Sequence, residues 1–141
     1  MLRKTGLMVA LLVSVFALGF AAGRAPEAAA QTKSRLFELR IYTANDGKFE
    51  ALKKRFRDGE PRIFEKNGIK FIGYWEAADP PQNTLIYILA HESREAATKS
   101  WEAFRQDPEF RPLTQESEKN GPTVAQRQVI FMNPADFSPI K

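Results

Sequence analysis

The residues best suited to chemistry lie in the stretch FELRIYT, residues 37–43. Side chains alternate along a β-strand, so we expect Glu38, Arg40 and Tyr42 on one face, about 7 Å apart, with apolar side chains on the other. An arginine in this position can bind a carboxylate or a phenolic oxygen, and a neighbouring glutamate can accept a proton. The alternative is a structural ion pair between Glu38 and Arg40, because a buried charge is costly unless it finds a partner.

A pocket forms around this strand if aromatic and polar side chains of later strands share its face. Two later segments supply such side chains, IKFIGYWEA at residues 69–77 and TLIYILAH at residues 84–91. Aromatic walls with a few polar groups are typical of small-molecule sites, so we expect a small aromatic or carboxylate ligand. Glu38 and His91 are the candidate proton acceptors. The predicted ligand-binding residues are Glu38, Arg40, Tyr42, Tyr74, Trp75, Tyr87 and His91.

His91 is the only histidine of the chain, and cysteine is absent. One imidazole is sufficient to ligate a haem iron, whereas a protein zinc site requires several His or Cys ligands. We therefore expect no metal site and no resident cofactor, with haem as the alternative. Catalytic residues are not assigned, because the sequence contains no nucleophile elbow, phosphate-binding loop or dinucleotide fingerprint.

Four strands are predicted to position these residues. Alternating runs of β-branched and aromatic side chains predict strands at Arg35–Thr43, Ile69–Ala77, Thr84–His91 and Ala125–Met132. An irregular tail, Asn133–Lys141, is expected to follow the last strand, because its two prolines keep the chain extended.

Helices are predicted from capping residues and from apolar side chains at helical spacing. The first is expected to begin near Gly47 and to break at Gly59–Pro61, and a second piece covers Pro61–Lys66. Ser93 caps the third helix, and the last begins at Asp107. In the first helix the apolar face is expected to carry Phe49, Leu52 and Phe56, and the solvent face Lys53, Lys54, Arg55 and Arg57.

The order strand, helix, strand, strand, helix, strand predicts an α+β protein with the ferredoxin-like split βαβ fold. In this fold a four-stranded antiparallel sheet has the strand order 4-1-3-2, with helices on one face only, which makes the first strand central. Bulky apolar groups are expected on both faces: Ile72 and Tyr74 on one, Phe71 and Trp75 on the other. The face without helices therefore needs a second covering layer, and we expect another copy of the chain to supply it in a homodimer.

Residues 1–30 have the pattern of a secretory signal peptide. A basic start precedes an uncharged apolar run, Leu7–Phe20, and small residues allow cleavage after Ala30. This predicts a periplasmic or secreted domain comprising residues 31–141. The alternatives are a mitochondrial transit peptide and an uncleaved anchor, and we expect membrane association only if the segment stays uncleaved.

The charge balance also limits the possible partners. Cleavage after Ala30 removes three basic residues and one acidic residue, which lowers the formal net charge from +4 to +2. A nucleic-acid-binding domain needs a concentrated basic face to neutralise phosphates. We therefore expect no nucleic acid partner.

Several short motifs in a fixed order together resemble the NIPSNAP family. They are ELRIYT at residues 38–43, GI at 68–69, GYW at 73–75, Asn83, ESR at 92–94, DPEF at 107–110 and NPADFSP at 133–139. The resemblance extends from about Leu36 to Pro139. It departs from the family at His91, where members often have an aromatic residue before the Glu-Ser pair.

The resemblance implies a dimeric α+β barrel, in which the sheets of two chains close into a shared barrel. The expected function is that of an exported, homodimeric barrel protein that binds a small molecule or a partner. The alternative is a monooxygenase, haem-dependent or without a cofactor, that acts on an aromatic or quinone-like substrate. Its substrate would lie in the cleft between helices and sheet.

Overall fold

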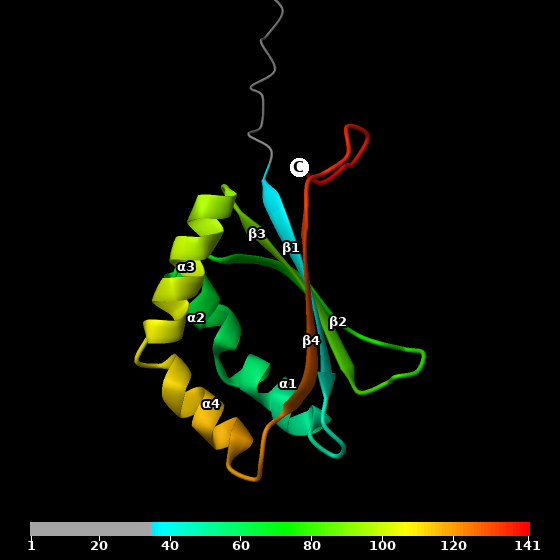
Figure 1. The fold of residues 1–141 in the computed structure, drawn as a ribbon, viewed down its shortest axis with the longest axis vertical. Helices are drawn as coiled ribbons and strands as arrows, with labels where there is room; N and C mark the ends of the chain where they lie inside the picture. The colour runs from blue at the N-terminus through cyan, green and yellow to red at the C-terminus, as the bar shows by residue number, and fades with distance from the viewer. Residues whose placement is uncertain (1–34) are drawn as a thin grey trace, which may run out of the picture. The chain divides into compact units, whose positions relative to one another are not determined.

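The computed structural model describes residues 35–141, so the predicted signal peptide lies outside the described residues (Figure 1). No helix in this described part is long and apolar enough to span a bilayer. In chain order the elements are β1 (Leu36–Ala44), α1 (Phe49–Asp58), α2 (Glu60–Lys66), β2 (Lys70–Glu76), β3 (Thr84–His91), α3 (Arg94–Gln106), α4 (Phe110–Glu118) and β4 (Val124–Met132).

The four strands form one antiparallel sheet in the order β2-β3-β1-β4, with all four helices on one side (Figure 1). This confirms the predicted strand order and the ferredoxin-like α+β fold. β1 is central, with Arg40 opposite Tyr87 of β3 and opposite Val129 of β4. The predicted candidate residues of β1 therefore have a strand on either side.

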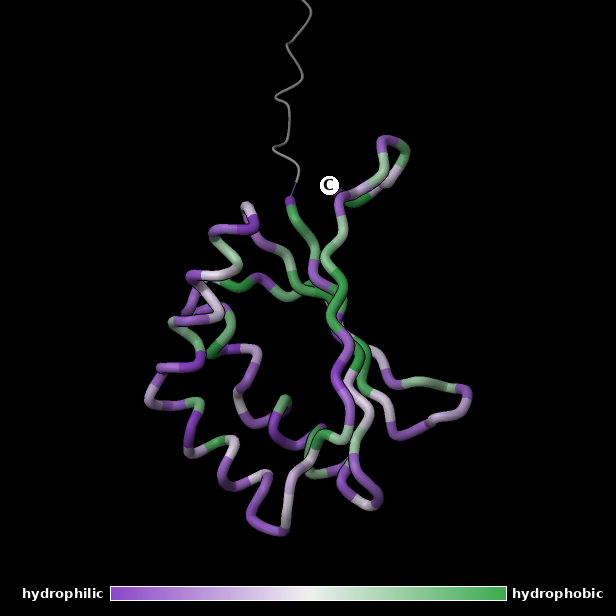
Figure 2. The backbone as a smooth tube through the Cα atoms, viewed as in Figure 1, coloured by the Kyte–Doolittle hydropathy of each residue, from purple (hydrophilic) through white to green (hydrophobic). Residues whose placement is uncertain are grey.

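The core lies between the helices and the sheet. Figure 2 shows hydrophobic residues concentrated along the strands, whereas hydrophilic residues interrupt the helices at short intervals, as expected for helices with one buried face. Aromatic rings fill much of this layer and meet at edge-on and tilted angles. The buried core consists of Tyr42, Ala44, Leu52, Phe56, Ile63, Phe64, Ile69, Leu85, Tyr87, Leu89 and Phe104.

A β-bulge in β2 changes which side chains share a face. The register against β3 shifts between Phe71 and Gly73, and the rings of Phe71 and Tyr74 then lie side by side, 5.5 Å apart. Ile72 faces away from the helices. The predicted pairing of Ile72 with Tyr74 is therefore wrong, because a bulge adds one residue to a strand and breaks its strict alternation.

The helix ends differ from the prediction in two places. α1 begins at Phe49, after a turn in which Asn45 O accepts from Lys48 N, rather than near Gly47. α4 begins at Phe110, since Asp107 Oδ1 accepts from Glu109 N (2.9 Å) and closes a turn ahead of the helix. The predicted break at Gly59 is confirmed. Its φ of 157° is a backbone conformation that residues with a side chain adopt only under strain, and Gly59 separates α1 from α2.

The sheet face away from the helices is apolar and largely uncovered, and we call it the open face. Trp75 is 50% exposed and Ile130 is 49% exposed. The tail covers one end of the face, where Phe37 is only 6% exposed. The larger apolar side chains of the open face are Phe37, Leu39, Ile41, Ile72, Trp75, Ile86, Ile88, Ile130 and Met132.

Candidate functional site

Glu38 is the centre of a buried hydrogen-bonded cluster on the helix-facing side of the sheet. His91 Nε2 at the end of β3 and Trp101 Nε1 of α3 both donate to Glu38 Oε2, each at 2.8 Å. Arg40 Nε donates to Oε1 at 2.7 Å, and Nη2 lies 2.7 Å from the same oxygen in the ion pair. The predicted ion pair between Glu38 and Arg40 is confirmed, and three side chains rather than one hold the carboxylate.

The donors decide the charge of Glu38. Burial by itself raises the pKa of this carboxyl, but the hydrogen bond from His91, the charge of Arg40 and the hydrogen bond from Trp101 together outweigh burial and lower the pKa. Glu38 is therefore an ionised carboxylate at neutral pH with its oxygens already occupied. This arrangement suits a residue that positions Arg40 better than a residue that accepts a proton.

Arg40 is held rigidly on three sides. Its guanidinium lies 3.7 Å from the ring centre of Trp101, and Nη1 donates to the Tyr42 hydroxyl at 2.7 Å. A guanidinium has five N–H donors, and the hydrogen bonds to Glu38 and Tyr42 use one on Nε and one on Nη1, while Nη2 also lies against Glu38. At least one donor therefore remains on each terminal nitrogen, which is the spacing that a carboxylate accepts.

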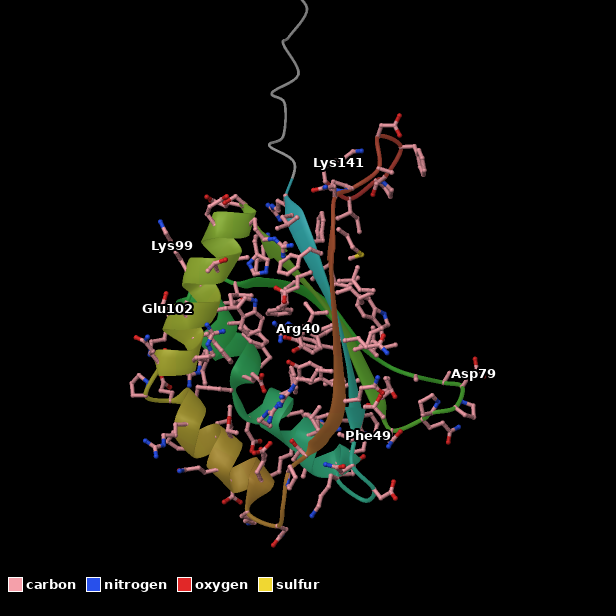
Figure 3. All side chains as sticks on the ribbon, viewed as in Figure 1. Arg40, Phe49, Asp79, Lys99, Glu102 and Lys141 are labelled. Carbon is pink, nitrogen blue, oxygen red and sulfur yellow. The ribbon has the colours of Figure 1, made fainter. Side chains whose placement is uncertain are left out.

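Arg40 can be reached from the side of the sheet that ends in β4. Figure 3 shows it between the helical layer and the sheet, and its side chain is 15% exposed. The helices leave β4 uncovered, because Val129, which faces them, is 43% exposed. We call this region the β4 flank and define it by Arg94, Arg127, Val129 and Phe131.

The β4 flank is cationic and aromatic. The guanidinium of Arg94 lies 3.7 Å from the ring centre of Phe131, and that of Arg127 lies 5.4 Å from the ring centre of Tyr42. Within residues 35–141 neither arginine makes a salt bridge. Both arginines and the contact of Trp101 with Glu38 were missed by the sequence analysis, because they depend on packing between distant elements.

Three tyrosines extend from the Arg40 site into the core. The rings of Tyr42 and Tyr87 meet edge-on at 5.2 Å, and Tyr74 follows at 5.6 Å from Tyr87. Burial raises the pKa of Tyr74 and of Tyr87, so both hydroxyls stay protonated. Among the described residues these two hydroxyls have no hydrogen-bond partner, which leaves each able to donate to an incoming oxygen atom.

A second buried acid lies near the tyrosines. Arg55 Nε donates to Glu60 Oε2 at 2.7 Å, and both side chains are 4% exposed. Burial raises the pKa of Glu60 more than the charge of Arg55 lowers it. The expectation that Arg55 faces solvent is wrong: it lies one helical turn after Leu52 and shares its buried face.

The structure brings together only part of the predicted set. Glu38, Arg40, Tyr42 and His91 form one contiguous group, and Tyr87 packs against it. Tyr74 lies beyond Tyr87 and lines a separate hollow of about 270 Å³ at the β2 edge. Trp75 borders the same hollow, with its ring over Gly73, and does not join the group around Glu38.

The residues around His91 do not fit a haem. Its Nε2 is occupied by Glu38, and its Nδ1 is buried without a partner among the described residues. An iron ligand needs a ring nitrogen that faces an open, flat space. Within the described part of the chain, no group of three or more His, Cys, Asp or Glu side chains is arranged to hold a metal ion.

The fold and its site can be compared with known proteins. The sequence model of the NIPSNAP family matches residues 37–139. A NIPSNAP family protein of unknown function from Agrobacterium tumefaciens superposes with a TM-score of 0.68 at 21% identity, covering 78% of this chain and 96% of that one. An uncharacterised NIPSNAP domain protein from Burkholderia xenovorans superposes with a TM-score of 0.64 at 21% identity, covering 74% and 98%.

The fold also extends beyond this family. A monooxygenase from Streptomyces coelicolor, solved with the ligand nanaomycin D, has a TM-score of 0.50 at 14% identity and covers 73% of this chain and 89% of that one. No curated protein matches the sequence. The architecture defines a ferredoxin-like α+β protein with its polar cluster between sheet and helices. Since the family match spans most of the chain, the protein belongs to the NIPSNAP family.

Proposed function

We propose that this NIPSNAP protein is an exported homodimer that binds a small aromatic carboxylate or phenolate at Arg40. The observation that carries the proposal is the state of Arg40: a part-buried guanidinium, fixed by Glu38, Tyr42 and Trp101, with at least one N–H donor left on each terminal nitrogen. A cation held so rigidly loses little conformational entropy when it binds an anion.

The surroundings of Arg40 select the charge and the shape of the ligand. Arg94 and Arg127 add two positive charges on the β4 flank, whereas Glu38 contributes one negative charge that is already paired. Guanidinium groups and aromatic rings both stack on planar molecules. A flat anion can therefore bind Arg40 with its charged end and contact Tyr42 or Phe131 with its ring.

The binding proposal is tested by calorimetric titration with benzoate, 4-hydroxybenzoate and cyclohexylacetate. We expect the two aromatic acids to bind and the aliphatic acid to bind more weakly. Arg40→Lys keeps the charge but loses the paired donors, so affinity should fall at least tenfold. The matched control is Arg105→Met, which removes an exposed arginine of α3 and should change nothing. Equal affinities in wild type and Arg40→Lys would refute the role of Arg40.

Pairing is proposed for the open face. Its exposed Trp75 and Ile130 form part of an apolar surface that water covers in a single chain. A second copy with the same surface is self-complementary under two-fold symmetry. Light scattering after size exclusion should give twice the chain mass, and Ile41→Glu, on the central strand of this face, should shift the mass to that of one chain.

Export is proposed from the pattern of residues 1–30. Mass spectrometry of the protein recovered from a periplasmic extract should give a chain that starts at Gln31. Recovery of the full-length chain in the membrane fraction would instead support the anchor reading.

A cofactor-independent monooxygenase is the second candidate function. It is favoured by the unpartnered hydroxyls of Tyr74 and Tyr87 and by the nearby Glu60, whose raised pKa suits a proton acceptor. Oxygen consumption with a naphthohydroquinone as substrate, measured with an oxygen electrode, tests this function. Oxygen uptake above the uncatalysed rate that disappears in Glu60→Gln would support the monooxygenase. Uptake equal to the uncatalysed rate would contradict the monooxygenase and leave ligand binding as the proposed function.

A further inference from the structure

The chain after β4 folds into a compact turn, which we call the C-terminal hook (Asn133–Lys141). Ser138 N donates to Ala135 O at 3.0 Å, and Ser138 Oγ donates to Ile140 O at 2.8 Å. Lys141 Nζ donates to Asp136 O at 2.7 Å and closes the turn. Figure 1 shows the hook in red, standing beyond the end of β4 and away from the helices. Its own hydrogen bonds therefore shape it.

The hook presents apolar side chains to solvent. Phe137 is 89% exposed and Ile140 is 54% exposed, the highest values among the large apolar side chains of the described residues. Burying such a side chain stabilises a protein, because apolar surface is removed from water. An ordered turn that holds a phenylalanine in water is thus suited to inserting this ring elsewhere.

A cleft lies between the hook and the open face. It has a volume of about 440 Å³. Each of the four strands contributes one residue to its floor: Phe37, Ile72, Ile88 and Met132. Phe137 borders this cleft but remains almost fully exposed, so the chain's own ring does not fill it. The cleft is large enough for an aromatic side chain and is lined almost entirely by apolar groups.

The hook would enlarge an interface between two open faces. Four strands about 4.8 Å apart, with about 3.3 Å per residue along strands of this length, outline a flat sheet of about 500 Å², to which the side chains add accessible surface. A typical stable interface buries about 800 Å² on each partner. An inserted aromatic ring adds about 150–250 Å², and the cleft walls that receive it add a comparable area on the other chain.

We propose that the C-terminal hook is an exchanged arm: Phe137 of each chain inserts into the cleft of a second copy of the same chain. The inference rests on the proposed pairing of open faces and names the residue that completes the interface. Under two-fold symmetry the contact occurs twice: each chain inserts its Phe137 into the cleft of the other chain and receives the other chain's Phe137 in its own cleft. The two β4 ends then lie close together in the dimer.

The absence of cysteine makes a clean test available. Phe137→Cys and Ile72→Cys are prepared separately in chains of different mass, mixed, and oxidised. We expect a mixed disulfide that joins one heavy and one light chain. In the matched control, Phe137→Cys is mixed with Lys99→Cys, whose site lies on the outer side of α3 (Figure 3), and no mixed product should form.

A double variant with both cysteines in one chain distinguishes insertion of residue 137 into a second chain from insertion into the cleft of its own chain. A disulfide within one chain, with no mixed product between chains, would overturn the proposal. A dimer by light scattering whose mixed cysteine variants do not cross-link would overturn the exchange and leave the pairing of open faces standing. A monomer would remove both, without affecting ligand binding at Arg40.

Phe137→Asp provides an independent measurement. Since the ring is exposed in the single chain, melting of the monomer at low concentration should not change. The dissociation constant of the dimer, measured by sedimentation equilibrium, should rise at least about tenfold, as for an aromatic anchor at an interface centre. An unchanged dissociation constant would show that the ring is outside the interface.

Discussion

Glu38 and Glu60 are both buried glutamates paired with arginine, yet their charges are stabilised to very different degrees. Glu38 accepts from Arg40, His91 and Trp101, and its pKa lies below the usual range. Glu60 accepts from Arg55 through one oxygen, and its pKa lies above the usual range. The two side chains are similarly inaccessible, at 0% and 4%. Glu60 has fewer donors and also loses more hydration on burial than Glu38, and both differences favour its neutral form.

The contrast assigns the two acids different roles. A carboxylate with every oxygen occupied orients its neighbours and resists protonation, so Glu38 fixes the position of Arg40, the proposed ligand-binding residue. A carboxyl group whose pKa is raised takes up a proton more readily than an ordinary one. Glu60 is therefore the better proton acceptor, although Glu38 and His91 were the candidates predicted from the sequence.

The largest effect is expected when Glu38 is removed. Glu38→Ala removes the acceptor of His91 and Trp101 and leaves the part-buried Arg40 guanidinium with only the Tyr42 hydroxyl, which should lower the free energy of unfolding by about 3–5 kcal/mol. Urea unfolding followed by circular dichroism measures the loss. Glu92→Ala, at an exposed neighbouring position, is the control and should stay within about 0.5 kcal/mol of wild type. A loss below about 1 kcal/mol would mean that the cluster does not depend on its acceptor.

The Glu60 pair should be replaceable as a unit. Glu60→Leu alone leaves Arg55 charged and buried, at a cost of about 3 kcal/mol, but Arg55→Met with Glu60→Leu should return to within about 1 kcal/mol of wild type. A double-mutant cycle in urea measures this coupling. Arg55 Nη1 also lies 3.8 Å from Glu118 Oε1, so a double variant as unstable as the single one would assign the stabilisation to that second contact of Arg55.

Removing one hydrogen-bond donor from Glu38 should reduce the difference between the pKa values of Glu38 and Glu60. Trp101→Phe keeps the ring stack but loses the indole N–H, which should cost about 1–2 kcal/mol. The pKa of Glu38, followed by carboxyl NMR shifts, should rise towards the usual range. A pKa that does not move would assign the low value of Glu38 to Arg40 and His91 alone.

The smallest expected effect, and the most specific, is an opposite dependence of stability on pH. The folded pKa of Glu38 is lowered, so its contribution is present above the unfolded pKa and is lost as pH falls through the folded value. The folded pKa of Glu60 is raised, so its contribution is present below the unfolded pKa and is lost as pH rises through the folded value. Each pKa unit corresponds to about 1.4 kcal/mol.

Unfolding free energies of wild type, Glu38→Gln and Glu60→Gln between pH 3 and 8 test these signs, a range chosen to bracket about pH 4.3, the usual pKa of glutamate. The advantage of wild type over Glu38→Gln should grow with pH. Its advantage over Glu60→Gln should shrink with pH. Two curves of the same sign would remove the distinction between the acids.

The fold could be predicted because its signals are local. Alternation over residues 37–43 placed Glu38, Arg40 and Tyr42 on one face, and the cap Ser93 accepts from Ala96 N as expected. The bulge in β2 has no comparable signal, since Gly73 within a strand is compatible with a regular register too. The faces of β2 were for this reason misassigned.

The cluster was predicted where neighbouring strands contain it, through Glu38 and Arg40 of β1 and His91 of β3. Trp101 reaches Glu38 across 63 positions of the chain, and that contact depends on how α3 packs on the sheet. Arg55 did carry a usable signal, because it lies at helical spacing from Leu52. Glu60 carried a weaker one, as a charged residue directly after the helix break at Gly59.

The chain contains two tryptophans, and the sheet separates them. Trp101 lies on the helix-facing side beside Glu38 and Arg40, whereas Trp75 lies flat over Gly73 on the open face. The intrinsic fluorescence of the protein is therefore the sum of two local reporters. Quenching by acrylamide can follow what reaches the outer indole, while the emission of the inner one responds to whatever occupies the space next to Arg40.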